Sequence, residues 1–310
     1  MNRAGFAAVI GAPNAGKSTL VNRLVGSKVS IVTQKVQTTR FPVRGVAIEG
    51  ESQIVLVDTP GIFRPRRRLD RAMIRAAWGG AEDADAVVHL VDAEAELAAS
   101  KPGAKSADKR SAEDVRTIIA GLLKSNRKAI LALNKIDRVQ SADLMALTRT
   151  LFESGAYDEV FMISAARGHG VDDLKARLAA LMPEGHWLYP ADQTADLPVR
   201  MLAAEITREK VYLRVHEELP YAASVETTAF EEKPDGSARI EQIIYVEREG
   251  QRPILIGKGG ATLKWIGEAS RTELAQILGH PVHLFLTVKV KSNWADDRGI
   301  FRDLGLDFDV

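Results

Sequence analysis

The chain of 310 residues contains no cysteine. This excludes disulfide bonds and cysteine-ligated metal centres, and it fits the reducing conditions of a cytoplasm, where we expect the protein to act. The sequence also lacks any apolar run approaching the roughly 20 residues that a membrane-spanning helix needs. A predicted strand follows directly after Met1-Asn2-Arg3, so we expect no signal peptide.

The sequence also has no large excess of positive or negative charge, because its formal net charge is +1. Bulk electrostatics therefore indicate no particular partner. Residues 1–182 hold 27 Lys and Arg against 20 Asp and Glu, whereas residues 198–310 hold 15 against 18. The negative balance of the second part argues against indiscriminate binding to nucleic acid, which is mainly electrostatic.

What the sequence does contain is a glycine loop, residues 11–19, between an apolar run (residues 6–10) and an amphipathic segment (residues 20–25). Strand, glycine loop and helix together are typical of a phosphate-binding loop. The backbone N–H groups of such a loop and the helix N-terminus surround an anion. We predict that Lys17 reaches the β- and γ-phosphates and that the Ser18 hydroxyl ligates Mg²⁺.

A second phosphate-site motif, Asp58-Thr59-Pro60-Gly61, ends a strand-like run over residues 52–57. A carboxylate at a strand tip suits a water-mediated Mg²⁺ contact, and Gly61 can donate its N–H to a γ-phosphate. The predicted phosphate contacts are Gly11, Ala12, Pro13, Asn14, Ala15, Gly16, Lys17, Ser18, Thr19, Asp58 and Gly61.

A third motif, Asn134-Lys135-Ile136-Asp137, follows a predicted buried strand over residues 129–133. We expect it to contact the base of a bound nucleotide. The Asp137 carboxylate can accept from N1–H and the exocyclic amine of guanine, and adenine does not offer this pair of donors. We predict that Asn134 ties this motif to the phosphate loop and that the Lys135 stem covers one face of the base. Ser164-Ala165, after a predicted strand over residues 159–163, supplies a backbone N–H for guanine O6.

Three other stretches have less specific interpretations. The basic run Arg64–Arg68, with Arg71 and Arg75 on the helical segment that follows, is either a solvated face or a surface for RNA or the ribosome whose position depends on the γ-phosphate. His89, inside an apolar strand, is predicted to be a core residue. The Ala-, Ser- and Lys-rich stretch over residues 94–111 contains Pro102-Gly103 and predicts a long flexible loop.

Together, these motifs resemble the sequence elements of a Ras-like P-loop GTPase. The variant Gly-x-Pro-Asn-x-Gly-Lys-Ser, with Gln37-Thr38-Thr39-Arg40 and Asp58-Thr59-Pro60-Gly61, is similar to the Era and tRNA-modification branch. The resemblance implies an α/β domain over residues 1–182 with a doubly wound, mostly parallel sheet. It also implies that Thr38 or, preferably, Thr39 closes on Mg²⁺, so that the expected metal residues are Ser18, Thr39 and, through water, Asp58.

Where Ras-like enzymes place a water-orienting glutamine, this chain has Ile62. Because isoleucine cannot orient a water molecule, we expect slow intrinsic hydrolysis of GTP to GDP and phosphate. In the relatives, the residue matching Asn14 helps to hold a K⁺ ion near the β- and γ-phosphates. The expected catalytic residues are therefore Lys17, Thr39, Gly61 and Asn14, with Mg²⁺ and K⁺ as cofactors.

A second domain is predicted over residues 198–310, after a proline-containing linker at residues 183–197. We expect a helix over 199–219, strands over 224–231 and 239–247, a helical stretch over 261–278 and a strand over 283–290. This gives the order α-β-β-α-α-β if the long stretch breaks near Gly267. The order, with Gly257-Lys258-Gly259-Gly260 in the helical region, resembles a smaller α+β type II KH domain.

In KH domains a GxxG loop clamps the backbone of about four unpaired nucleotides. We therefore expect a local basic surface suited to a short RNA site. The predicted RNA contacts are Ile256, Gly257, Lys258, Gly259, Gly260, Lys264, Lys289 and Lys291.

Across nearly its whole length the chain resembles the Era family. The resemblance implies a monomeric GTP/GDP switch that binds the 3′ end of 16S ribosomal RNA and acts in maturation of the 30S subunit, with peripheral association at the inner membrane. The alternatives are a switch whose KH-like domain docks on a protein or membrane surface, and a tRNA-directed GTPase. The segment 94–111 and the terminal Asp307-Phe308-Asp309-Val310 depart from the family pattern, and neither is expected to touch the site.

Overall fold

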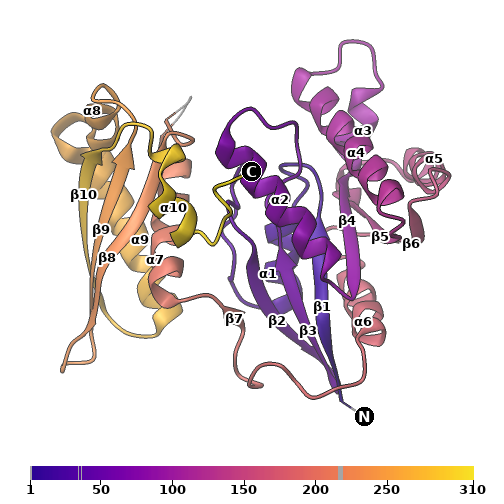
Figure 1. Ribbon diagram of the computed structural model, residues 1–310, viewed down its shortest axis with the longest axis horizontal. Coiled ribbons are helices and arrows are strands. Elements are labelled where there is room, and N and C mark those ends of the chain that lie inside the picture. The colour runs from indigo at the N-terminus through magenta and orange to yellow at the C-terminus, as the bar shows by residue number, and fades with distance from the viewer. Residues whose placement is uncertain (1, 34, 36, 216–218) are drawn as a thin grey trace. The chain divides into compact units, whose positions relative to one another are not determined.

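The computed structural model describes residues 2–33, 35, 37–215 and 219–310 (Figure 1). The chain separates into two compact units. One contains the chain up to Ser30, Thr39–Asp196 and Leu304–Val310, and the other contains Ile31–Thr38 and Leu197–Asp303. The short segment Ile31–Thr38 thus belongs to the unit that is built mainly from the C-terminal part of the sequence. Conversely, Leu304–Val310 belongs to the unit that is built mainly from the N-terminal part.

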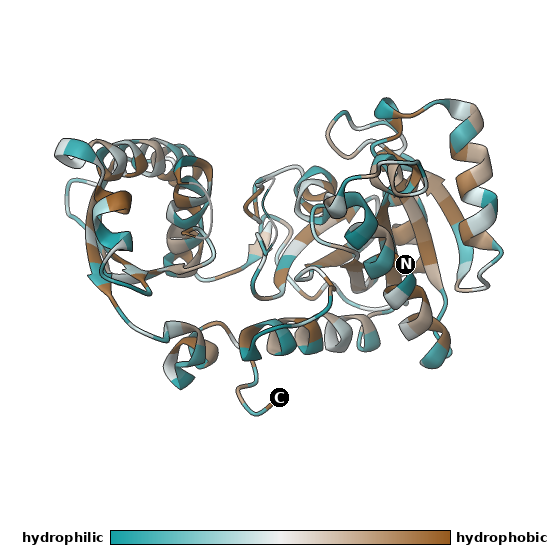
Figure 2. Ribbon diagram, turned by 90° about the horizontal axis from the view of Figure 1, so that it is seen from above, coloured by the Kyte–Doolittle hydropathy of each residue, from teal (hydrophilic) through white to brown (hydrophobic). Residues whose placement is uncertain are grey.

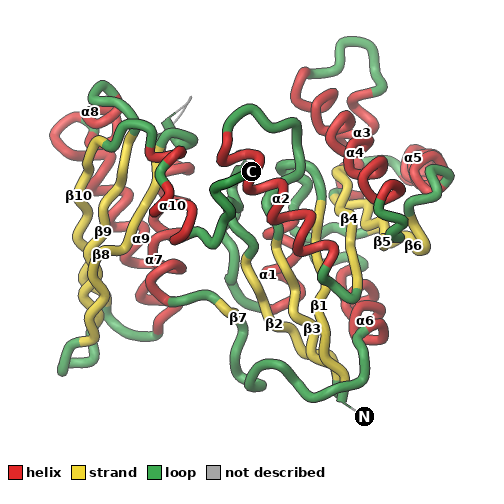
Figure 3. The backbone as a smooth tube through the Cα atoms, in the orientation of Figure 1, coloured by secondary structure: helices red, strands yellow, loops and turns green. Residues whose placement is uncertain are grey.

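A seven-stranded sheet in the order β6-β5-β4-β1-β3-β2-β7 forms the centre of the first unit (Figure 3). Its strands are β1 (Arg3–Ile10), β2 (Val43–Glu49), β3 (Ser52–Asp58), β4 (Ala86–Asp92), β5 (Ala129–Asn134), β6 (Tyr157–Met162) and β7 (Ala195–Asp196). Neighbours from β6 through to β3 pair in parallel, while β2 and β7 are antiparallel additions at one edge. The predicted doubly wound, mostly parallel sheet is confirmed.

Helices cover both faces of this sheet. Because side chains alternate along a strand, Ala7 and Val9 of β1 join one core with α1 (Lys17–Val25) and α6 (Val171–Leu181). Ala8 and Ile10 join the opposite core with the helices α2 (Arg68–Glu82), α4 (Ser106–Lys124) and α5 (Ser141–Phe152). The inner strands are buried on both faces, which explains their nearly continuous apolar sequences, brown in Figure 2.

His89 is a core residue, as predicted. It is fully buried in β4, and its Nδ1 lies 2.8 Å from the Tyr157 hydroxyl. Burial lowers the pKa of His89 to about 3, so the imidazole is neutral at physiological pH. The contact gives one of the two imidazole nitrogens a partner inside the core, whereas Nε2 is buried without one among the described residues.

The predicted flexible loop over residues 94–111 is wrong for most of its length. Residues Ala93–Ala99 form α3, and α4 begins at Ser106. The Asp92 carboxylate accepts a hydrogen bond from the Ala95 N–H at 3.1 Å and caps α3. Alanine, glutamate and lysine favour helix, so Pro102-Gly103 interrupts the helical structure only between the two helices.

The second unit is a three-stranded sheet with helices packed on it. Its elements are α7 (Val199–Arg214), β8 (Ala223–Glu232), β9 (Ala238–Val246), α8 (Gln251–Ile256), α9 (Ala261–Leu278), β10 (Val282–Val290) and α10 (Arg298–Asp303). In the sheet order β10-β9-β8, β10 is parallel to β9 and β8 is antiparallel to it. Ile244 of β9 packs in one core with Val211 of α7, Leu255 of α8 and Ile266 of α9.

Two details of the predicted second domain are corrected. The helix α9 runs through Gly267 without a break, and the additional helix is α8, which precedes the glycine loop. A six-residue helix is too short to show a helical period, and Pro253 in its first turn is tolerated because that N–H has no intrahelical partner. The helix predicted to reach residue 219 ends at Arg214, and residues 216–218 lie outside the described part of the chain.

The segment predicted as a linker packs against the start of β3 and supplies β7, the edge strand of the larger sheet. The Gln53 side chain accepts from the N–H groups of Leu188 and Tyr189 and donates to the Tyr189 carbonyl. The Trp187 indole donates to the Glu51 carbonyl at 3.0 Å. Among the described residues, no helix has both the length and the apolar character that crossing a membrane requires.

Candidate functional site

The glycine loop lies between β1 and α1, at the carboxyl edge of the parallel strands, and its two outer glycines have no room for a side chain. A Cβ on Gly11 would lie 2.4 Å from the Leu90 carbonyl oxygen. A Cβ on Gly16 would lie 2.4 Å from the Asn134 amide nitrogen, and Gly16 has a φ of 102°. The loop therefore requires glycine at both positions, and its concave backbone opens at the N-terminus of α1.

Lys17 is 6% exposed and points back into this loop. Its ammonium donates to the carbonyls of Gly11 at 3.1 Å and Ala12 at 3.0 Å. Burial lowers the pKa of Lys17 to about 8, although the nearby Asp58 carboxylate opposes this shift. The geometry thus places a partly desolvated cation where the motif predicts contact with phosphate.

Three of the predicted metal residues come together although they lie far apart in the sequence. The Ser18 hydroxyl donates to Asp58 Oδ2 at 2.8 Å and lies 3.0 Å from the Thr39 hydroxyl, which in turn lies 3.2 Å from Asp58 Oδ2. Asp58 is fully buried, and burial raises the pKa of its carboxyl group. Two hydroxyls and one carboxylate are hard oxygen ligands, which suit Mg²⁺.

Asn134, at the end of β5, links the base-side motif to the phosphate loop as expected. Its Nδ2 donates to the Ala15 carbonyl at 2.8 Å, and its Oδ1 accepts from the Ala165 N–H at 2.9 Å. Of the two N–H groups that the sequence offers for guanine O6, that of Ala165 is therefore bonded to Asn134, and that of Ser164 donates to the His169 carbonyl at 2.9 Å. Ser164 and Ala165 are both buried beside Asn134.

The Asp137 carboxylate lies at the surface of the same edge. A hydrogen bond from the Ser164 hydroxyl lowers the pKa of Asp137, and Arg167 Nε donates to its Oδ2 at 3.0 Å. Lys135, the residue predicted to cover the base, donates to Asp92 Oδ2. Neither Arg167 nor Asp92 was predicted, because no motif spacing marks them.

Gly61 and Ile62 lie directly against the phosphate loop. A Cβ on Gly61 would lie 3.0 Å from Pro13, so a larger residue here would press on the phosphate loop. The Ile62 N–H donates to the Gly11 carbonyl at 3.1 Å, and its side chain is 1% exposed within the core that contains Ile10. Position 62 therefore presents no polar group to a water molecule.

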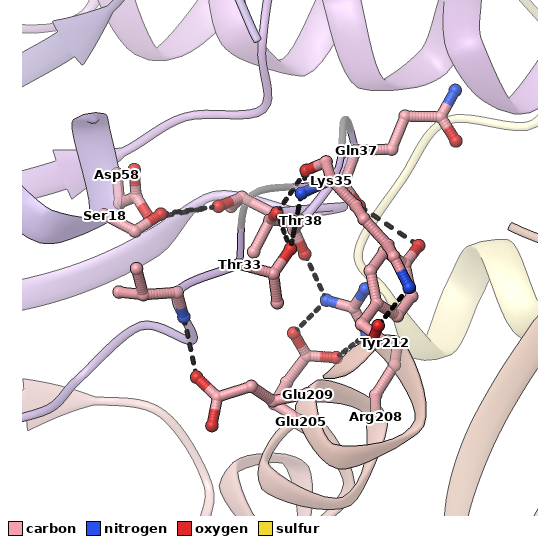
Figure 4. A network of polar contacts seen from close by, with 12 residues as sticks. Ser18, Thr33, Lys35, Gln37, Thr38, Asp58, Glu205, Arg208, Glu209 and Tyr212 are labelled. Carbon is pink, nitrogen blue, oxygen red and sulfur yellow. Dashed lines mark hydrogen bonds and ion pairs between the residues drawn. The ribbon is translucent and has the colours of Figure 1, made fainter. Parts of the chain in front are cut away.

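The segment Ile31–Thr38 packs on α7 through polar contacts (Figure 4). The Val32 N–H donates to Glu209 at 2.8 Å, and the Lys35 ammonium donates to the Tyr212 and Val215 carbonyls. The Thr38 hydroxyl donates to the Lys35 carbonyl at 2.7 Å. Thr38 is therefore turned into its own segment, whereas Thr39 carries the hydroxyl beside Ser18.

Arg208 holds the carbonyl of the peptide bond that joins Thr38 to Thr39. Its guanidinium donates to that oxygen and, at 2.7 Å, to Glu205, and it lies 5.2 Å from the centre of the Tyr212 ring. The Arg208 side chain is 2% exposed. A buried arginine of α7 thus fixes the backbone immediately before a predicted metal residue.

The glycine loop of the second unit connects α8 to α9. Gly257, Gly259 and Gly260 have φ values of 76°, 59° and 80°, and Lys258 and Gly259 are exposed. The N-terminus of α9, an 18-residue helix, follows directly. Exposed loop backbone, a lysine and a helix N-terminus together can bind a phosphate group.

The four lysines predicted to contact RNA lie on different elements of the second unit. Lys258 and Lys264 lie on the loop and on the exposed side of α9. On β10 the alternate residue Val288 packs toward the helices, so Lys289 points from the opposite face of the sheet. Lys291 lies 5.6 Å from the centre of the Tyr245 ring and 2.8 Å from Asp297.

The fold and the site together define a P-loop GTPase domain joined to a KH domain, and two family models agree. The model described as "50S ribosome-binding GTPase" matches residues 6–135, and a KH-domain model matches residues 218–295. The chain is 72% identical over 308 residues to GTPase Era of Caulobacter vibrioides, covering 99% of this chain and 98% of that protein. It is 62% identical to GTPase Era of Maricaulis maris, with the same coverage. The chain belongs to the GTPase Era family.

Two solved structures are similar over both units. Era in complex with MgGDPNP and nucleotides 1506–1542 of 16S ribosomal RNA has a TM-score of 0.87 at 36% identity, covering 98% of this chain and 99% of that one. A variant of Aquifex aeolicus Era bound to GDP·AlF4⁻ has a TM-score of 0.85 at 35% identity, with the same coverage.

We expect Arg208→Met to loosen the segment Ile31–Thr38. The substitution leaves Glu205 and the Thr38 carbonyl without their shared cationic donor, and removal of one partner of a buried ion pair costs about 3–5 kcal/mol. Tryptic cleavage after Lys35 and Arg40 should become at least about tenfold faster. Arg214→Met is the matched control, because Arg214 lies on the same helix but stacks on Trp265.

Arg208→Lys keeps a positive charge beside Glu205 and is the conservative variant. Local opening of the segment is distinguished from unfolding of the whole protein by a denaturation experiment. Urea denaturation of all three variants shows whether the whole fold is affected. Equal cleavage rates for the Arg208→Met and Arg214→Met variants, with equal unfolding midpoints, would contradict the assigned role of Arg208.

Proposed function

We propose that this protein is a GTP-hydrolysing switch that binds the 3′ end of 16S ribosomal RNA through its KH domain and acts in small-subunit assembly. The observation that carries the proposal is the similarity, over 98% of the chain, to an Era structure that contains both MgGDPNP and nucleotides 1506–1542 of 16S ribosomal RNA. The arrangement of Lys17, Ser18 and Asp58 around one loop supports the GTP-binding half of the proposal.

Mg²⁺ fits the oxygen cluster beside Lys17. Ser18 and Thr39 would ligate it directly, and Asp58 would hold it through a water molecule. When bound, the ion neutralises charge on the β- and γ-phosphate oxygens. Lys17 holds the same oxygens, and the Gly61 N–H positions the γ-phosphate.

The proposed hydrolysis is slow without further help, because position 62 offers no group to orient the attacking water. The site must then depend on charge stabilisation in the transition state. Asn14, which has a φ of 62° in the glycine loop, is the residue through which K⁺ would supply this charge.

Hydrolysis should therefore be faster in K⁺ than in Na⁺, and the difference should depend on Asn14. We expect a difference of about tenfold or more, because one well-placed electrostatic contact is worth that much or more in such reactions. Single-turnover rates of GTP hydrolysis in the two salts measure it. Asn14→Ala should bring the K⁺ rate down to the Na⁺ rate, and equal rates for the unsubstituted protein would remove K⁺ from the mechanism.

Guanine recognition is assigned to Asp137, so Asp137→Asn should change the base preference from guanine to xanthine. An amide donates a hydrogen bond where the carboxylate accepts two, which matches the 2-keto group of xanthine. We expect the ratio of GTP to XTP affinity to fall by at least about a hundredfold. Competition of each nucleotide against a fluorescent GDP measures this ratio.

Arg167→Gln is the control for the base-preference test. It removes the 3.0 Å partner of Asp137 while the carboxylate stays. The Arg167→Gln variant should still prefer GTP. Loss of guanine preference in both variants would show that the geometry of the loop, and not the Asp137 carboxylate, selects the base.

The RNA half of the proposal depends on the loop between α8 and α9. Gly259 and Gly260 have positive φ and open space where a Cβ would lie, so a phosphate group can approach the loop backbone closely. Ile254, 61% exposed on α8, offers an apolar contact for a base next to the loop. A short binding loop of this kind is compatible with the net negative charge of residues 198–310. A broad groove that binds RNA mainly by electrostatic attraction is not compatible with it.

Gly259→Asp tests RNA binding by placing a carboxylate where the phosphate would lie. Gly236→Asp is the matched control, because Gly236 also has a positive φ, 78°, and a Cβ added at either glycine would have no atom within 4 Å. Fluorescence anisotropy with a labelled 16S 3′-end oligonucleotide, with and without a non-hydrolysable GTP analogue, gives the affinities. We expect a loss of at least about tenfold for Gly259→Asp and little change for Gly236→Asp.

Equal affinity of both variants for the oligonucleotide would overturn RNA recognition by this loop and favour docking of the KH domain on a protein or membrane surface. Tighter binding to tRNA than to the 16S oligonucleotide would favour the tRNA-directed alternative.

A further inference from the structure

The helix α2 carries a row of arginines on one face. Arg68, Arg71 and Arg75 are spaced by three and four residues, which places them on the same side of the helix. Asp70, the acidic residue of the first turn, accepts from the Arg66 and Arg67 N–H groups at the helix N-terminus. We call the three arginines the α2 arginine face.

The C-terminal tail of the chain, residues 307–310, lies on this face. The Arg68 guanidinium lies 4.4 Å from the centre of the Phe308 ring, Arg71 Nε donates to the Val310 carbonyl at 3.3 Å, and Arg75 lies 3.4 Å from the Asp307 carboxylate. Leu306, which precedes the tail, is 6% exposed and anchors it. In Figure 1 the C-terminus lies beside α2.

Each arginine of the face thus meets a different part of the tail. Within four residues the tail presents two carboxylates, a backbone carbonyl and one aromatic ring. A short single strand of RNA presents the same groups: anionic oxygens at close spacing and flat rings that stack. Arginine is suited to both, because its planar guanidinium forks onto phosphate and stacks on aromatic faces.

The tail is held weakly enough to be displaced. The side chains of Arg75 and Asp307 are 65% and 54% exposed, and ion pairs of this kind contribute little net stability in water. Arg64, Arg66 and Arg67 continue the positive surface beyond the tail and are also exposed. A longer polyanion could therefore contact more arginines than the tail does.

We propose that the C-terminal tail is an internal competitor for single-stranded RNA at the α2 arginine face. RNA reaches this face when the tail leaves it, and the KH loop binds RNA at a separate place. The choice of RNA over an acidic protein segment rests on the proposed function, whereas the competition itself rests on the contacts of the tail with the three arginines.

The test measures RNA affinity after the tail is neutralised by Asp307→Asn, Phe308→Ala and Asp309→Asn together, with Leu306 retained. All proteins carry Gly259→Asp, so that the KH loop contributes little and failure of the KH assignment is detected separately. The probe is a labelled 12-nucleotide single-stranded RNA of mixed sequence. We expect binding to tighten about three- to tenfold, since each exposed ion pair changes an equilibrium by a factor of up to about five.

The salt dependence provides a second readout. Three more arginine–phosphate contacts should steepen the slope of log affinity against log salt by about two, at about 0.7 per phosphate of a single strand. Replacing Arg68, Arg71 and Arg75 by Gln in the same background should abolish both the gain in affinity and the steeper slope.

Asp303→Asn with Glu232→Gln is the charge-matched control, because it removes two exposed acidic groups that do not belong to the tail. The proposal is overturned if this control tightens RNA binding as much as the tail variant, if the tail variant shows no gain, or if the gain persists without the three arginines. A gain for anionic vesicles or for poly-glutamate, but not for RNA, would also overturn it and would assign the face to a membrane or to an acidic protein.

Discussion

The nucleotide site depends on two opposite charges that the fold keeps out of water. Lys17 and Asp58 are both buried at the carboxyl edge of the parallel sheet, and burial opposes the charged form of each: it lowers the pKa of Lys17 to about 8 and raises that of Asp58. The carbonyls of Gly11 and Ala12 and the hydroxyls of Ser18 and Thr39 offset part of this cost. A ligand that brings phosphate to Lys17 together with a cation for Asp58 would stabilise both charged forms at once. Because folding has already removed water from Lys17 and Asp58, the site favours binding of a phosphate group together with a metal ion.

Much of this site could be predicted because its motifs lie where strands end. The glycine loop, Asp58 and Asn134 follow β1, β3 and β5, and a parallel sheet brings such positions to one edge. The preference for Thr39 over Thr38 agrees with the hydroxyl geometry. The partners of these residues could not be predicted, since the contact of Arg208 with Thr38 joins positions 170 residues apart and depends on packing.

The predictions that were wrong have separate physical causes. In residues 94–111, Pro102-Gly103 indicates a loop, but the helix propensity of the alanines around it prevails on both sides. The break predicted near Gly267 does not occur, because a single glycine is tolerated inside a long helix, and the additional helix α8 is too short to show a helical period. The position of the tail on α2 joins Arg71 to Val310, which are 239 residues apart, and no local pattern indicates it.

The near-zero net charge of the chain conceals a local arrangement of charges. The arginines of α2 belong to the basic part of the sequence and the tail to the acidic part, and the structure places them against each other. A small net charge therefore does not mean that the surface is uniform. A solvent-exposed ion pair is weak, so another charged molecule can displace one partner and bind the other.

The assignment of Ile31–Thr38 to one unit and Leu304–Val310 to the other bears on how this protein can be dissected. A cut in the linker would separate the two halves of the sequence but not the two units. The N-terminal fragment would carry Ile31–Thr38 without the helix it packs on, and its α2 would be stripped of the residues that cover its arginines. Activities measured on such fragments would describe surfaces that other segments cover in the intact chain, so this molecule has to be studied whole.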